Sequence, residues 1–178
     1  SELYDTKEKV KGNKYCVSIK NKYMGSYVLK ALVESKYIGK IIIVTDTKKV
    51  KLKSIKRIKF VHQIGSVTQN FLGGLKYIDS NRNKPILVIA ADLPLLNKKA
   101  VDALILEYNK YKSDIFLGLV PFDNFEGLLG ICVTNFQPIR VNNKLLYAEK
   151  VNGLIVKPRE LAKNKKLMDI VQMVYENR

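Results

Sequence analysis

Two kinds of hydrophobic pattern alternate along the first two thirds of the chain. Continuous apolar runs rich in β-branched residues, typical of strands buried on both faces, occur at 40–45 and 85–91, with a shorter run at 58–62. Between these runs, apolar residues recur at intervals of three and four, which is the spacing of an amphipathic helix. This spacing predicts helices over 23–36, 66–78 and 97–111.

The last third of the chain has shorter apolar runs without long helical stretches between them. Runs at 115–120, 128–133 and 145–149 predict three more strands. The polar segment 121–127 separates the first two and predicts a loop. Apolar positions at helical spacing over 159–175 predict a closing helix.

The order of these elements indicates an α/β fold. Strands that alternate with helices imply right-handed crossovers and a largely parallel sheet, and the later strands imply that the sheet is mixed at one end. The length of 178 residues fits a single domain over 1–178. In such sheets ligands bind outside the carboxyl ends of the strands, which draws attention to the residues after Thr45, His62 and Ala91.

Composition matters here through what it excludes. A hydrophobic share of 47% is enough to bury a core, so the chain is not wholly disordered. The apolar runs are too short to cross a bilayer and no secretory pattern opens the sequence, so we expect a cytoplasmic protein without membrane contact. Cys16, Cys132 and a single histidine do not make a disulfide framework or one of the usual zinc clusters. The two cysteines are interpreted as core residues, and the lone His62 as structural.

The charge leaves two interpretations open. The 32 Lys and Arg residues outnumber the 16 Asp and Glu residues, for a net charge of +16, but only five are Arg, the residue on which nucleic-acid readers rely. The surplus is either a solvated lysine surface or a surface for a polyanionic ligand. The segment 48–59, from Lys48 to Lys59, carries seven basic residues in twelve. It is either an electrostatic footprint on nucleic acid or an exposed connection between two strands.

The strongest candidate for chemistry is Asp92. It directly follows the apolar run 85–91, and Pro94 ends the strand and fixes the turn. A carboxylate at this position suits Mg²⁺, which proteins hold with one or two carboxylates plus substrate phosphates. The alternative is an aspartate that only caps the turn before the helix that begins at Asn97.

Three stretches resemble, in the same order, motifs of the MobA-like nucleotidyltransferases. Residues 91–96, ADLPLL, resemble the xDxPL motif of that family. Residues 13–24 resemble its NKALIPI–GKPM stretch, which leads into a YVLxAL helix, here YVLKAL at 27–32. Residues 65–75 resemble its G-S-x-x-x-N-x-x-x-G-L helix start, and together the matches cover roughly 15–100.

The resemblance implies a Rossmann-like three-layer α/β/α fold with a mostly parallel mixed sheet. It also implies a Mg²⁺-dependent transfer of a nucleoside monophosphate from an NTP, with GTP or CTP expected, to a phosphorylated small-molecule acceptor. Pyrophosphate is released. The alternative is a domain that binds a nucleotide without turnover, or one that binds nucleic acid through 48–59.

For the nucleotide, the resemblance implies five residues. Asp92 would hold Mg²⁺ against the α-phosphate, and Lys14 would contact the triphosphate as the second catalytic residue. Gly65, with Ser66 after it, would allow close approach of the nucleotide, and Asn70 would order that loop or bind the base or ribose. Each residue also has a structural alternative. Lys14 is then a surface lysine, Gly65 only allows a tight turn, and Asn70 is an ordinary polar helix residue.

For the acceptor, the resemblance points to Lys22 and to Asn152. Residues 151–154, VNGL, correspond to a turn over the acceptor in the family, although Asn-Gly is equally a plain turn. The family also opens with a strand and a glycine-rich loop that cradles the triphosphate, and no such segment stands in these residues. Because that strand is central in the family's sheet and its absence would leave backbone groups unpaired, we expect the segment upstream of Ser1.

Overall fold

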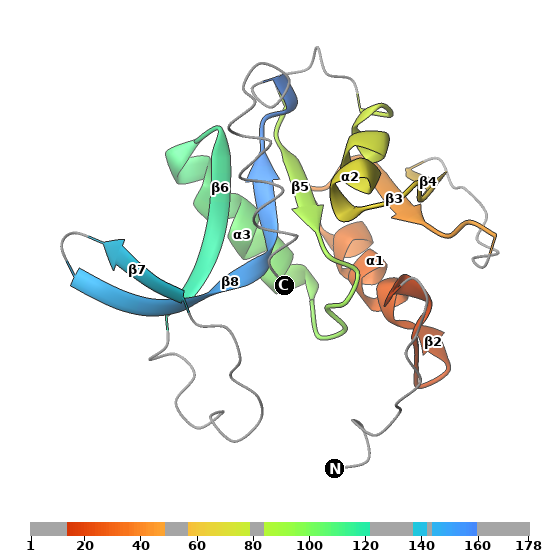
Figure 1. Ribbon diagram of the computed structural model, residues 1–178, viewed down its shortest axis with the longest axis horizontal. Helices are drawn as coiled ribbons and strands as arrows, with labels where there is room; N and C mark the ends of the chain where they lie inside the picture. Colours follow the sequence, from red (N-terminus) through yellow and green to blue (C-terminus); the bar gives the residue numbers. More distant parts are fainter. Residues whose placement is uncertain (1–13, 49–56, 79–83, 122–136, 142–143, 160–178) are drawn as a thin grey trace.

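The computed structural model describes residues 14–48, 57–78, 84–121, 137–141 and 144–159 (Figure 1). In chain order the elements are the 3₁₀ helix η1 (Lys14–Cys16), β1 (Ser18–Ile19), β2 (Lys22–Tyr23), α1 (Met24–Glu34), β3 (Ile41–Thr45), β4 (Ile58–His62), α2 (Val67–Leu75), β5 (Ile86–Ile89), α3 (Lys98–Tyr111), β6 (Ile115–Pro121), β7 (Gln137–Val141) and β8 (Lys144–Val156).

Strands β3 and β4 form a parallel pair. Ile41 lies opposite Ile58 and Thr45 lies opposite His62, so both strands end at the same edge. Helix α2 packs against β3 through a glycine, because a Cβ added to Gly74 would stand only 3.1 Å from Cγ2 of Val44. The small residue therefore lets the helix approach the strand closely.

Strand β8 organises the second sheet. It pairs antiparallel with β5, β6 and β7, and it lies between β5 and β6. Leu154 and Val156 of β8 are 1% and 0% exposed and form the centre of the core. The apolar side chains packed around them are Phe71 and Leu75 of α2, Ile86 and Val88 of β5, and Ile115 and Leu117 of β6. Helix α2 therefore contacts both sheets.

The helices cover both faces of the strands. Figure 1 shows α2 in front of the strands, and α1 and α3 behind them. Tyr108 of α3 is 3% exposed and its ring meets Phe116 of β6 edge-on, with 6.0 Å between the ring centroids. Helix α1 is joined to α3 by a hydrogen bond between Ser35 and Asp102. The protein thus has mixed α/β architecture, as the sequence predicts.

The sheets are less parallel than the sequence pattern suggests in the described part of the chain. Only β3 and β4 form a parallel pair there, and the pairs made by β8 and by the β1–β2 hairpin are antiparallel. In the same described residues, β3 pairs only with β4 and β5 only with β8, so one edge of each has no strand partner there. The sequence signal for a parallel strand is burial on both faces, and it does not report direction.

The prediction of a turn at 151–154 is wrong, because these residues continue strand β8. Asn152 lies inside the 13-residue strand β8, and Gly153 is opposite Ile89 of β5. The pairing shifts here, because Leu117 of β6 faces Leu154 whereas Leu119 faces Lys150, so the Asn-Gly pair is accommodated as an irregularity within a strand. The predicted strand at 145–149 is one part of β8.

Several expected features lie outside the described residues. They are the strand at 128–133, most of the loop at 121–127, Cys132, and the helix at 159–175 beyond its first residue. Among the helices that the structure describes, none combines the length and apolar character that a membrane crossing requires.

Candidate functional site

Asp92 lies three residues beyond the end of β5, in the turn that leads to α3. The residue is partly buried, and its Oδ1 atom is shielded from solvent. The turn is fixed on its far side, where Leu96 donates its N–H to the carbonyl of Leu93 at 3.0 Å. The side chain of Asn97 then caps α3 by accepting from the N–H of Ala100 at 3.1 Å. Asp92 therefore directly precedes an ordered turn and a capped helix.

Gly65 and Ser66 lie in the loop before α2, and Asn70, at the start of that helix, is hydrogen-bonded to it; we call this segment the Gly65–Asn70 loop. Asn70 accepts from the N–H of Ile64 at 2.7 Å and donates to the carbonyl of Gly65 at 3.1 Å. Both polar atoms of the Asn70 side chain are thus used on the backbone of the loop. The loop follows β4, so it lies at the carboxyl end of the parallel pair.

A capping box completes this loop. Ser66 accepts from the N–H of Gln69, and the Gln69 side chain accepts from the N–H of Ser66 at 2.8 Å. A Cβ on Gly65 would stand 1.9 Å from Oε1 of Gln69, so the glycine leaves space for the glutamine. The side-chain oxygen of Ser66 is used on the helix as an acceptor.

Lys22 lines a hollow at the β1–β2 hairpin. Lys20 and Asn21 form the turn with positive φ values of 47° and 61°, as a two-residue hairpin turn requires. The hairpin is tied to α1 by two hydrogen bonds, from Met24 N–H to the carbonyl of Val17 at 2.7 Å and from the Tyr27 hydroxyl to the carbonyl of Ile19 at 3.0 Å. The hollow has a volume of about 470 Å³ and is lined by Ser18, Asn21, Lys22, Tyr23 and Ser26.

The electrostatics of this hollow favour an anion. Lys22 contributes an exposed ammonium group, and the remaining lining side chains are hydroxyls and an amide. Helix α1 begins at its edge with no side-chain cap at Tyr23 and no acidic residue in the first turn. The partial positive charge of the helix start therefore adds to that of Lys22.

The other predicted site residues lie elsewhere in the chain. Lys14 opens η1, seven residues before Asn21, and Asn152 lies within β8. The structure joins Gly65, Ser66 and Asn70 in one loop, and it places Asp92 and Lys22 on two other elements. The loop contacts are local, so a Ser-x-x-Gln capping signature in the sequence could have found them.

The sequence drew attention to the carboxyl ends of β3 and β4, but it did not predict that polar side chains meet there. Nδ1 of His62 lies 3.1 Å from the Thr47 hydroxyl and 4.0 Å from a carboxylate oxygen of Asp46. Asp46 also accepts from the N–H of Lys48 at 3.1 Å. These side chains meet because the two parallel strands end side by side. Pairing the ends of the two predicted strands in the sequence would have indicated this contact.

The described residues contain no group of three or more His, Cys, Asp or Glu side chains that could hold a metal ion. A single carboxylate still fits Mg²⁺ where substrate phosphates supply further ligands, and Asp92 is such a carboxylate. Its position beyond the carboxyl end of β5 agrees with that mode of binding.

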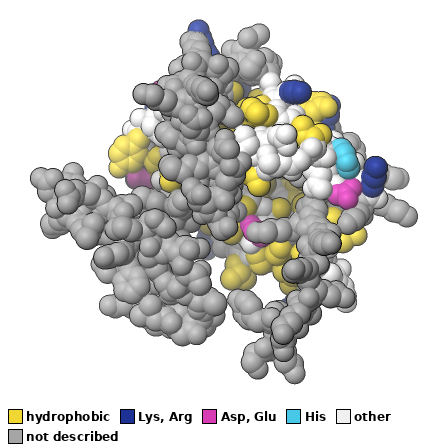
Figure 2. All heavy atoms as spheres, viewed as in Figure 1, with side chains coloured by type: hydrophobic (Ala, Val, Ile, Leu, Met, Phe, Trp, Pro, Cys, Tyr) yellow, Lys and Arg dark blue, Asp and Glu magenta, His cyan; other side chains and the backbone are white. Residues whose placement is uncertain are grey.

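The basic segment 48–59 is described only at its ends, with 49–56 outside the described residues. Arg57 uses its guanidinium on the backbone carbonyls of Ile38 and Gly39. The ammonium of Lys59 lies 3.9 Å from the ring centroid of Tyr77. These two side chains are therefore engaged within the protein. Hydrophobic side chains also reach the surface on the face drawn in Figure 2. The exposed hydrophobic residues in and just before α2 include Ile64, Val67 and Leu72.

Comparison with known families gives one match. The family model described as the MobA-like NTP transferase domain matches residues 8–129, which is more than half of the chain. The matched region contains the Asp92 turn, the Gly65–Asn70 loop and the hairpin of Lys22. No curated protein matches the sequence.

Solved structures with the same fold include several transferases. A hypothetical transferase from Thermus thermophilus superposes with a TM-score of 0.62 and 17% identity, over 92% of this chain and 64% of that one. The 2-C-methyl-D-erythritol 4-phosphate cytidylyltransferase of Francisella tularensis has a TM-score of 0.62 and 13% identity, over 92% and 74%. A CMP:2-keto-3-deoxy-manno-octonic acid synthetase complexed with CTP has a TM-score of 0.60 and 13% identity, over 92% and 78%. The chain thus spans less than two thirds of the first of these proteins, and these similarities concern the fold.

Proposed function

Because this chain belongs to the MobA-like NTP transferase domain family, we propose that it transfers a nucleoside monophosphate from an NTP to a phosphorylated small molecule. The observation that carries the proposal is the position of Asp92, whose carboxylate stands in an ordered turn beyond the end of β5 within the matched region. The same membership supports a three-layer α/β/α domain over 1–178 with a mostly parallel mixed sheet.

The reaction requires positioning and charge stabilisation. An oxygen of the acceptor phosphate attacks the α-phosphorus of the NTP and forms a new P–O bond. The bond from the α-phosphorus to the bridging oxygen of the β-phosphate breaks, and pyrophosphate leaves with that electron pair. An acceptor phosphate is already ionised, so no protein base has to remove a proton.

Asp92 is the residue that would hold Mg²⁺, together with phosphate oxygens of the substrate. The ion, when bound, supplies positive charge to the transferring phosphoryl group. What the protein contributes is a carboxylate on the residue directly before the ordered Leu93–Leu96 turn and the Asn97 cap. Lys14, at the start of η1, would contact the triphosphate.

The loop of Gly65, Ser66 and Asn70 is proposed to receive the nucleotide. It stands at the carboxyl end of the parallel strands, where ligands of such sheets bind. The CMP:2-keto-3-deoxy-manno-octonic acid synthetase, a structural neighbour, is complexed with CTP, which makes CTP one candidate for the nucleotide. The guanylyltransferases of the family make GTP the other candidate. Asn70 would act here by keeping the loop in shape, because both of its polar atoms bond to the loop backbone.

The hollow at the hairpin is proposed to receive the phosphorylated acceptor. Lys22 and the first turn of α1 supply positive charge, and the hydroxyls of Ser18 and Ser26 line the same space. Asn152 was assigned to the acceptor through a turn that is absent from β8, so Lys22 is the stronger of the two candidates.

The test is a turnover screen with the full-length protein. Each NTP is incubated with Mg²⁺, inorganic pyrophosphatase and a panel of phosphorylated sugars, alcohols and amino acid derivatives, and phosphate release is measured. We expect one nucleotide and one acceptor class to give release that requires both. Release with no acceptor, or no release from any pair, would contradict the proposal.

A further inference from the structure

We propose that Ser35 and Asp102 are positioning residues, whose contact holds the Asp92 turn, which leads into α3, at a fixed place relative to the Lys22 hollow, which adjoins the start of α1. The inference rests on the proposed function, and neither residue belongs to the motifs that indicate the family. Ser35 lies directly after α1, and Asp102 lies in the first half of α3. The two residues are 67 positions apart in the sequence.

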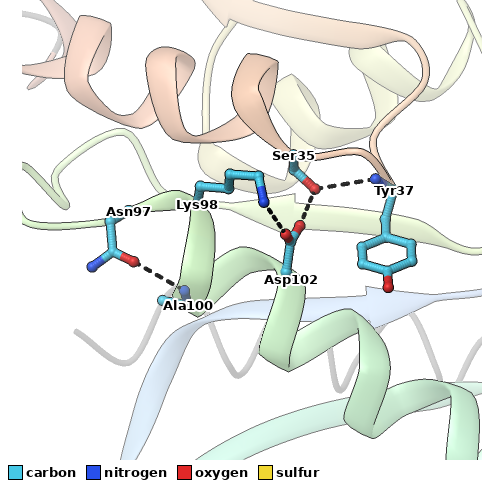
Figure 3. Close-up of polar contacts among 6 residues, drawn as sticks. All are labelled: Ser35, Tyr37, Asn97, Lys98, Ala100 and Asp102. Carbon is cyan, nitrogen blue, oxygen red and sulfur yellow. Dashed lines mark hydrogen bonds and ion pairs between the residues drawn. The ribbon is translucent and has the colours of Figure 1, made fainter.

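The contact is short and enclosed (Figure 3). The Ser35 hydroxyl donates to Oδ1 of Asp102 at 2.5 Å, and Ser35 is only 2% exposed. The same hydroxyl oxygen accepts from the N–H of Tyr37 at 3.3 Å. The other carboxylate oxygen of Asp102 receives the ammonium of Lys98 at 2.8 Å. Both oxygens of Asp102 are therefore used, one within α3 and one across to the end of α1.

The charge of Asp102 is stabilised in this arrangement. The hydrogen bond from Lys98 and then the one from Ser35 lower the pKa of the Asp102 carboxyl, and the charges of Lys98 and Lys36 act in the same direction. Tyr37 and Glu34 also lie close enough to influence Lys98. A hydrogen bond to an ionised acceptor is stronger than one between neutral groups, so the link between the helices is a firm one.

On the α3 side, a series of hydrogen bonds leads from the link to the turn that directly follows Asp92. Lys98 and Asp102 join the first turn of α3 to its second, Asn97 caps the helix, and Leu96 bonds back to Leu93 directly after Asp92. A displacement of the start of α3 would therefore move the Asp92 turn with it.

On the α1 side, the helix itself carries the constraint. Its 11 residues span roughly 16 Å, with Ser35 after the last turn and Lys22 and Tyr23 directly before the first. A hydrogen-bonded helix of this length is stiff, so fixing one end restrains the other. The link therefore connects the two proposed substrate regions through two helices, and transfer depends on their separation because misplaced reactants lose rate steeply.

The experiment compares Ser35→Ala and Asp102→Asn with two control variants in the full-length protein. Asp102→Asn keeps an oxygen that can accept from Ser35 but loses the charge. Glu107→Ala removes a second ion pair of α3, the one with Lys110, which lies within that helix. Val101→Ala shortens a side chain of the same helix that is 1% exposed. This control lowers the stability of the protein, as the test variants do, but leaves the Ser35–Asp102 hydrogen bond in place.

Two quantities are read for each variant: the amide hydrogen exchange of Leu96 and Ala100, and kcat and KM for nucleotide and acceptor. For Ser35→Ala we expect exchange at Leu96 to rise about tenfold and kcat to fall about tenfold, with both KM values within about threefold of wild type. Asp102→Asn should show smaller changes of the same kind, and neither control should show them.

The proposal is overturned if Leu96 exchanges as in wild type, or if Val101→Ala lowers kcat and protection to the same extent at equal stability. If the wild-type protein turns over no pair of substrates, the proposed function fails. In that case the exchange of Leu96 alone decides whether the link holds the Asp92 turn.

Discussion

The ring of Tyr15 lies directly against the backbone of Gly25. A Cβ atom added to this glycine would stand 2.0 Å from Cδ2 of the ring, far inside contact distance. Tyr15 is 3% exposed, and burial together with the neighbouring Cys16 raises the pKa of its hydroxyl. The absence of a side chain at Gly25 thus lets η1, which begins at Lys14, pack onto the first turn of α1 beside the Lys22 hollow.

Replacing Gly25 by alanine is expected to destabilise the protein. The added methyl group would force the Tyr15 ring away from the helix, and overpacking of this kind costs about 1–3 kcal/mol in the free energy of unfolding. Chemical denaturation measures the loss. Gly39→Ala is the matched control, because a Cβ there has nothing within 4 Å. Equal unfolding midpoints for the two variants would show that the Tyr15 ring can move aside without a loss of stability.

The amide of Asn70 is expected to govern nucleotide binding. In Asn70→Asp the oxygen that accepts from Ile64 remains, but a second carboxylate oxygen would face the carbonyl of Gly65 in place of the donor. We expect KM for the NTP to rise about tenfold, because the loop loses a hydrogen bond and gains a negative charge near the triphosphate. Asn109→Asp, an exposed change on α3, should leave KM unaltered, and an unaltered KM in both variants would remove Asn70 from the nucleotide site.

The charge of Lys22 is expected to matter for the acceptor. Lys22→Gln should raise KM for the phosphorylated acceptor about tenfold or more, because a charge-assisted hydrogen bond is lost. Lys20→Asn removes the same charge from the same hairpin, outside the residues that line the hollow, and asparagine tolerates the positive φ of that position. The hollow is not the acceptor site if the two variants have equal KM values.

The pH dependence of stability should reveal the state of Asp102. Because its pKa is lowered in the folded protein, its ionised form adds stability above the ordinary value of 3.8, and that stability is lost as the pH falls through the folded value. Lys98, whose pKa is raised by Asp102, adds stability that is lost as the pH rises beyond the ordinary value of 10.5. Wild type should therefore unfold at higher denaturant than Asp102→Asn at neutral pH, and the two curves should converge in acid. A constant gap down to pH 2 would contradict this assignment.

The sequence predicted the elements whose signals are local. Strand β4 at 58–62 and the helices α1 and α3 follow from apolar spacing and β-branched runs, and their observed ends differ from the predicted ones by no more than two residues. The β1–β2 hairpin was missed because two-residue strands carry no periodicity, although Asn21 is a residue that tolerates positive φ.

Other features depend on partners distant in the chain. The Asn152–Gly153 pair looks like a turn, yet Gly153 pairs with Ile89 of β5, and its flanking residues Leu154 and Lys150 pair with β6, so the chain continues as a strand. The Ser35–Asp102 contact joins two unremarkable polar residues, and nothing in their spacing indicates it. Asp92 was found because its signal, an acidic residue and a proline after an apolar run, is continuous in the sequence.

The role of Asp92 in the transfer is tested by comparing Asp92→Asn with Asp114→Asn. Both changes remove one carboxylate, but Asp114 is exposed and pairs with Lys157 at the start of β6. The measurement is Mg²⁺-dependent pyrophosphate release by the full-length protein with its preferred NTP and acceptor. We predict that Asp92→Asn lowers kcat at least about 100-fold while Asp114→Asn stays near wild type. Turnover of Asp92→Asn at the rate of Asp114→Asn would show that the Asp92 carboxylate takes no part in the transfer.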